Sequence, residues 1–162
     1  MATVLDWERE EQFCDVIGWA EDAAQFVSQV VVIPKIPDTV HRIPRYIGGA
    51  EVVIGYSIPT THGGTCVPIW ELEGRKVHLL GGSPQRQMRE WEAMRAFCDV
   101  VSADGNMAQK MATGRCCYWT QKQSTHGHWQ PLNRAVEHDA PYEAFRRSCS
   151  NIADAWSRKR AR

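Results

Sequence analysis

The first candidate for chemistry in this 162-residue chain is an aspartate, Asp104, near the end of an apolar segment. The segment Asp99–Asn106 reads DVVSADGN, so Asp104 comes directly before Gly105 and Asn106. A carboxylate at the end of a buried strand can act as a nucleophile or as a general base. The same pattern also fits an Asx-type turn in which Asp104 caps the following helix. The local sequence leaves both roles open.

Two glycine pairs, Gly63-Gly64 and Gly81-Gly82, follow two other apolar segments. Because glycine has no Cβ, such a pair could let backbone N–H groups reach a flat ligand, or could simply form a tight turn. Lys35 ends a further apolar segment, where its ammonium group could reach a phosphate or extend into solvent. His78 lies inside a predicted strand, a position typical of a hydrogen-bonded core histidine.

Metal and cofactor chemistry have little support in the sequence. The candidate metal ligands are Cys116, Cys117, His126 and His128, and they lack the usual C-x₂₋₄-C spacing of zinc sites. No phosphate-loop GK[ST], HExxH or G-x-S-x-G motif is present. We therefore predict no metal and no cofactor.

Four short apolar segments must position these residues. They are rich in valine and isoleucine without polar alternation, which is typical of strands buried on both faces of a parallel sheet. Each ends in polar or turn-forming residues, and their intervals of about 20 to 25 residues match βα units. The predicted strands are Val30–Lys35, Glu51–Pro59, Lys76–Gly82 and Asp99–Asn106. Ligands of such folds bind at the carboxyl ends of the strands, where the candidates lie.

Three helices accompany the predicted strands. Periodic apolar residues indicate helices at Glu8–Gln25, Gln85–Phe97 and Pro141–Arg158, with Ser83 as the N-cap of the second. The region Cys116–Asp139 is predicted to be irregular. The rhythm of strands and helices continues without a linker, so we expect one domain.

Composition indicates a globular protein but excludes little. Hydrophobic residues make up 43% of the chain, and 19 lysines and arginines balance 19 aspartates and glutamates. Net charge alone therefore predicts neither a nucleic-acid nor a membrane partner, although the chain begins acidic and ends in RKRAR. No membrane span or signal peptide is evident, so we expect a cytoplasmic protein with six reduced cysteines.

The order of three motifs resembles the C-terminal half of the tRNA-guanine transglycosylase superfamily. The motifs are VVIGYSIPTTHGGT, KVHLLGGSPQRQ and CDVVSADGN, and the resemblance covers roughly Val30 to Arg115. It is closer to the phage and bacterial relatives that insert 7-deazaguanine bases into DNA. The resemblance implies an α/β fold, a partial (half) TIM-type barrel of about four parallel strands with a closing C-terminal helix. It implies a single domain, 1–162, with its core at 28–115 and the helix at about 140–158.

The resemblance also implies an activity and a site. Asp104 would attack the sugar C1′ of a guanosine and expel guanine, and a 7-deazaguanine-type base would take the vacant position. The substrate would be nucleic acid, DNA more than RNA, in the host cytoplasm if the protein is phage-encoded. The implied substrate-binding residues are Gly55, Tyr56, Thr60, Gly63, Gly64, Gly81, Gly82, Ser83, Gln85 and Asn106.

The chain is shorter than a complete barrel, which needs about 200 or more residues. A half-barrel exposes a sheet edge and an apolar interior, so we expect a homodimer or a partner that completes the barrel. The other alternative is a small open sheet with covering helices. The alternative function is a non-catalytic base-binding or nucleic-acid-binding module, or a regulatory subunit, derived from the same fold.

Overall fold

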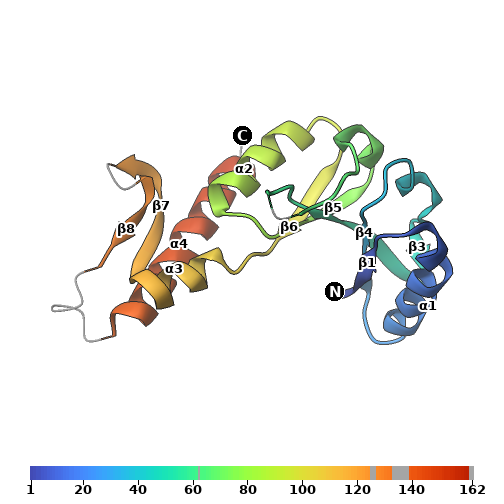
Figure 1. Cartoon of the computed structure of the whole chain (residues 1–162), viewed down its shortest axis with the longest axis horizontal. Coiled ribbons are helices and arrows are strands. Elements are labelled where there is room, and N and C mark those ends of the chain that lie inside the picture. Colours follow the sequence, from blue (N-terminus) through green and yellow to red (C-terminus); the bar gives the residue numbers. More distant parts are fainter. Residues whose placement is uncertain (62, 125–126, 133–138, 161–162) are drawn as a thin grey trace. The chain divides into compact units, whose positions relative to one another are not determined.

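The computed structural model describes residues 1–61, 63–124, 127–132 and 139–160 (Figure 1). The chain forms two compact units. The first unit comprises Met1–Gly81 and Glu90–Asp104, and the second comprises Gly82–Arg89 and Gly105–Arg162. Helix α2 (Pro84–Met94) contains residues of both.

A six-stranded sheet forms the centre of the first unit (Figure 1). Five strands are parallel, in the order β1-β2-β4-β5-β6, and the short β3 pairs antiparallel with β4. This confirms the prediction of an α/β fold with a mostly parallel sheet. The strands are β1 (Ala2–Trp7), β2 (Gln29–Pro34), β3 (Tyr46–Ile47), β4 (Ala50–Ser57), β5 (Lys76–Leu80) and β6 (Asp99–Ala103).

Strand β1 lies in a region for which no strand was predicted. Only Val4 and Trp7 are buried in it, while Leu5 is exposed, so β1 lacks the continuous burial of a strand covered on both faces. The predicted helix Glu8–Gln25 is correspondingly shorter. It is observed as η1 (Glu10–Gln12) followed by α1 (Phe13–Ala24), which packs against β1 and β2. Two further 3₁₀ helices, η2 (Val40–Arg42) and η3 (Ile69–Leu72), lie in the connections before β3 and β5.

The missing side chain of Gly55 is essential to the packing at the centre of the sheet. A Cβ built at this position would lie 2.7 Å from Ile33 Cγ1, 2.9 Å from Val31 Cγ1 and 3.0 Å from Leu80 Cδ1. Side chains of β2 and β5 thus close over the backbone of β4. Val31, Ile33 and Val53 form a buried cluster there, with Leu80 and Val101 packed against it.

The second unit joins helices to a β-hairpin. Its complete elements are α3 (Met107–Arg115), β7 (Cys117–Ser124), β8 (Gly127–Pro131) and α4 (Ala140–Arg160). The hairpin occupies part of Cys116–Asp139, so the expectation of an irregular region was wrong for β7 and β8. Helix α4 agrees with the predicted C-terminal helix within about two residues at each end.

Buried side chains hold the hairpin against α4. Trp119 of β7 is 1% exposed and packs with Met88 and Ala155. Its backbone N–H donates to Ser148 Oγ at 2.9 Å, and its carbonyl accepts from Asn151 Nδ2 at 2.7 Å. Two polar side chains of α4 therefore satisfy backbone groups of β7.

Among the described residues, no helix is long and apolar enough to cross a bilayer.

The packing over Gly55 generates a stability prediction. Gly55→Ala should lower the free energy of unfolding by about 1–3 kcal/mol, because the added methyl overlaps three core side chains. Gly18→Ala is the matched control, since nothing lies within 4 Å of the Cβ position in α1. That change should instead raise the free energy by about 0.5–1 kcal/mol. Urea denaturation measures both; equal effects would contradict the close packing over Gly55.

Candidate active site at the carboxyl edge of the sheet

Asp104 lies directly after β6 and is bonded to the end of β5. The Gly81 N–H lies 3.2 Å from Asp104 Oδ1 and 3.1 Å from the Asp104 carbonyl oxygen, and the Asp104 N–H donates to Leu79 O at 2.9 Å. The side chain of Asp104 is nevertheless 60% exposed. A carboxylate anchored at one oxygen and open to solvent can approach a substrate, as a nucleophile or base must.

A buried histidine and a serine complete the surroundings of Asp104. His78 Nε2 lies 3.5 Å from Asp104 Oδ2, and His78 Nδ1 lies 2.7 Å from Ser102 Oγ. His78 is 7% exposed, in agreement with the prediction of a hydrogen-bonded core histidine. If Ser102 donates to Nδ1, the ring carries its proton on Nε2, facing the carboxylate. Ser102 was not predicted, because its pairing with His78 depends on the register between β5 and β6.

Strand register separates two of the predicted base-binding residues. Gly55 pairs with His78, and Tyr56 pairs with Leu79. Because side chains alternate along a strand, Tyr56 points to the face opposite His78. Tyr56 is 5% exposed, so its ring presents no open surface on which a base could stack in this conformation. The space beside Gly55 is filled by core side chains.

The predicted glycine loop after β4 is a tight turn. Gly64 has φ 138°, and a Cβ there would lie 2.5 Å from Pro59 Cα. Thr60 N–H and Thr60 Oγ1 both donate to Gly63 O, at 2.6 and 3.0 Å. The turn interpretation therefore explains this pair of glycines. Gly81 also has a positive φ, 73°, but nothing lies within 4 Å of its Cβ position, next to Asp104.

Lys35 forms an ion pair. Its Nζ lies 3.0 Å from Asp6 Oδ2, with 16% of the lysine side chain and 40% of the aspartate side chain exposed. A phosphate would compete with Asp6 for this ammonium group. The sequence did not indicate Asp6 as a partner of Lys35, because no strand was predicted at β1.

Four of the predicted substrate-binding residues belong to the second unit: Gly82, Ser83, Gln85 and Asn106. Gln85 Oε1 accepts a hydrogen bond from Trp119 Nε1 at 2.9 Å, so this amide helps to hold the indole ring. Asn106 precedes α3, and its carbonyl accepts from Lys110 N at 2.9 Å. The carbonyl of Ser83 accepts from the N–H groups of Arg86 and Gln87, both at 2.9 Å, in the first turn of α2.

Where the structure describes them, the candidate metal ligands take part in packing and hydrogen bonding. Cys116 is buried at the end of α3, and burial raises the pKa of the Cys117 thiol. His128 Nδ1 lies 3.0 Å from Thr120 O, and its ring stacks on Trp119. His126 lies outside the described residues. Within the described part of the chain, no three histidine, cysteine or acidic side chains group as metal ligands would.

Comparison with known proteins assigns the chain to a family. Residues 1–157 match a family model described as a family of unknown function (DUF6610). The chain belongs to the DUF6610 family. No curated protein and no solved structure matches it. The DUF6610 match thus assigns the chain to a family without naming a reaction.

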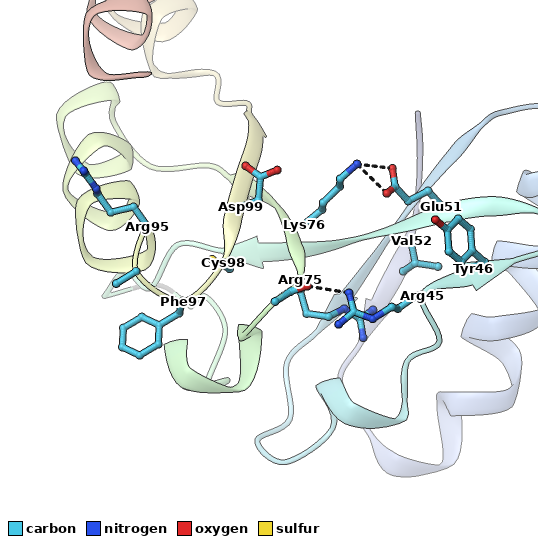
Figure 2. Close-up of a pocket in the computed structure, with 12 residues that line it drawn as sticks. Arg45, Tyr46, Glu51, Val52, Arg75, Lys76, Arg95, Phe97, Cys98 and Asp99 are labelled. Atoms are coloured by element: carbon cyan, nitrogen blue, oxygen red, sulfur yellow. Dashed lines mark hydrogen bonds and ion pairs between the residues drawn. The ribbon is translucent and has the colours of Figure 1, made fainter. Parts of the chain in front are cut away.

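The first unit of this DUF6610 protein also has a cavity of about 560 Å³ at the amino ends of its strands. Figure 2 shows Lys76 bonded to Glu51 there, with Arg45 and Arg75 beside them. The Lys76–Glu51 bond raises the pKa of Lys76 and lowers that of Glu51, with a hydrogen bond from Gln29 assisting. These two charges already satisfy each other.

Arg75 is a structural clamp in this cavity. Its guanidinium donates to Ile43 O at 2.8 Å, Pro44 O at 3.2 Å and Val40 O at 3.4 Å. Burial and the neighbouring charge of Arg45 lower the pKa of Arg75. The buried charge therefore holds the segment that leads into β3. This role fits the amino face of a parallel sheet, where the expected contribution is stability rather than catalysis.

The clamp can be tested by removing each arginine in turn. Arg75→Met should lower the free energy of unfolding by about 2–3 kcal/mol, because buried carbonyl groups lose a charged donor. Arg45→Met removes the same charge from the same cavity, but Arg45 is exposed, and its guanidinium donates to the carbonyl of Gly74 (Figure 2). Its effect should stay within about 0.5 kcal/mol. Thermal and urea unfolding compare the two, and equal losses would contradict the clamp.

Proposed function

We propose that this protein exchanges guanine for a 7-deazaguanine base in nucleic acid, DNA more than RNA, with Asp104 as the nucleophile. One observation carries the proposal. An exposed carboxylate at the carboxyl edge of a parallel sheet is held by Gly81 and lies beside the buried His78. This is the edge at which parallel α/β folds bind their ligands.

The topology supports a relationship to a partial TIM-type barrel. Five parallel strands follow one another in chain order across the sheet, as strands of a (β/α) barrel do. Asp104 follows the last of these strands, where the resemblance to guanine transglycosylases expects the nucleophile. Strand β1 adds one strand to the four expected from the sequence.

The proposed reaction has two halves. First, an Asp104 carboxylate oxygen bonds to the sugar C1′ as the C1′–N9 bond breaks, and the electron pair leaves with guanine, which takes a proton from solvent. Then the incoming base loses a proton to solvent, its nitrogen bonds to C1′, and the Asp104 carboxylate is released. A paired guanine must first be flipped out of the duplex.

His78 and Ser102 would orient the nucleophile. With its proton on Nε2, His78 attracts one carboxylate oxygen, while the Gly81 N–H holds the other. Ser102 fixes the imidazole ring by its 2.7 Å contact with Nδ1. The carboxylate therefore keeps one orientation before substrate arrives, which reduces the entropic cost of reaching the transition state.

A second function, binding of nucleic acid without base exchange, is favoured by a specific observation. Core side chains fill the space beside Gly55, and Tyr56 is buried, so two predicted parts of a base pocket are closed in this chain. A second copy or another polypeptide could supply the missing pocket. Strands β1 and β6 are the edges of the described parallel sheet, and such edges can pair with another chain.

Base exchange by Asp104 can be measured directly. Purified protein is incubated with duplex DNA, single-stranded DNA or tRNA and labelled guanine or 7-deazaguanine. Wild type should incorporate label, and Asp104→Asn should reduce incorporation by at least about 10³-fold because the amide is a poor nucleophile. The matched control is Asp99→Asn, an exposed aspartate at the other end of β6, which should keep wild-type activity.

Two results would argue against this function. Incorporation that survives in Asp104→Asn would remove Asp104 from the reaction. If circular dichroism shows that the protein is folded and it still incorporates label into none of the substrates, the binding module is favoured instead.

A further inference from the structure

The chain as a whole has no net charge, but its two units carry opposite net charges. The first unit contains 7 lysines and arginines and 15 aspartates and glutamates, a net charge of −8. The second contains 12 basic and 4 acidic residues, a net charge of +8. A unit of this charge attracts polyanions, which the charge of the whole chain does not indicate.

A groove in the second unit is lined only by hydrogen-bonding and basic side chains. It has a volume of about 390 Å³ and lies between β7 and α4. The groove is lined by Thr120, Gln121 and Lys122 of β7 and by Asn151 and Arg158 of α4. Two of these side chains are cations, three carry a hydroxyl or amide group, and none is acidic. Protein contacts to nucleic-acid phosphates use these residue types.

Hydrogen bonds connect the two sides of the groove. Asn151 Nδ2 donates to the carbonyl of Trp119, the buried residue that precedes Thr120. Arg158 Nη2 donates to Gln121 Oε1 at 3.0 Å across the groove. The two elements that carry the cations are therefore joined both below the groove and at its surface.

The two cations of the groove keep their charge available. Lys122 and Arg158 are exposed, and neither has an ion pair among the described residues. Elsewhere on α4, Arg146 and Arg147 share Glu143, and their hydrogen bonds lower the pKa of that carboxyl group to about 2. The basic charges of α4 are thus neutralised near its start but not in the groove.

We propose that this groove binds the phosphodiester backbone of nucleic acid through Lys122 and Arg158. The acid-free lining supplies donors for phosphate oxygens, and the +8 charge of the unit favours a polyanion over a single phosphate. The choice of nucleic acid as the partner rests on the proposed function. The binding itself does not require Asp104 or base exchange.

The test measures how binding depends on salt. Fluorescence anisotropy of labelled duplex DNA, single-stranded DNA and folded RNA gives affinities of the full chain between 50 and 200 mM salt. Two phosphate contacts correspond to a slope of about −2 in a plot of log affinity against log salt. Wild type should therefore lose about tenfold more affinity over this range than Lys122→Gln/Arg158→Gln.

The matched control is Lys110→Gln/Arg115→Gln, which removes the same charge from exposed positions of α3 in the same unit. The salt dependence of this variant should be closer to that of wild type than the salt dependence of Lys122→Gln/Arg158→Gln is. Equal losses in both double variants would overturn the groove assignment, because they would reflect net charge alone. Equal binding of polyglutamate, or of a second copy through its acidic first unit, would overturn nucleic acid as the partner.

Asp104→Asn separates this inference from the proposed function. It should bind nucleic acid with wild-type affinity even if base exchange is lost or never occurs. Loss of binding in Asp104→Asn, with Lys122→Gln/Arg158→Gln unaffected, would place the nucleic acid at the sheet edge and contradict the groove.

Discussion

The first unit depends on the absence of a side chain at Gly55. Because nothing projects from this position, side chains of β2 and β5 meet over the central strand β4, where they are buried together. This contact holds neighbouring parallel strands in register from β2 to β5, and β5 in turn pairs with β6. The position of Asp104 follows, since its carboxylate and backbone are bonded to Gly81 at the end of β5.

Much of this sheet could be predicted because a doubly buried strand reads as a run of valine and isoleucine. Strand β1 could not, since ATVLDW contains no such run and buries only Val4 and Trp7. The β7–β8 hairpin was missed because its strands are polar and derive their stability from α4 through Ser148 and Asn151. Tertiary contacts of this kind override local sequence preference.

The candidate site was predictable in its position along the chain but not in its contacts. The apolar segment before Asp104 indicated a strand end, and the carboxylate does lie at that edge. Ser102 and Asp6 could not be identified from the sequence, because their partners, His78 and Lys35, are distant along the chain. The first pair depends on the register of β6, and the second on the existence of β1. The opposite net charges of the units required knowledge of where the chain divides. Together these features describe an acidic sheet unit with an anchored carboxylate and a basic unit with an open groove.

The most direct test of the account is to trap the bond between Asp104 and the sugar. The protein is mixed with guanine-containing DNA without an incoming base, denatured, and digested for mass spectrometry. The account predicts a nucleic-acid adduct that survives denaturation and maps to Asp104, as expected of a covalent glycosyl-enzyme. An adduct at another residue, or none with DNA or RNA while the groove binds them, would contradict a catalytic role for Asp104.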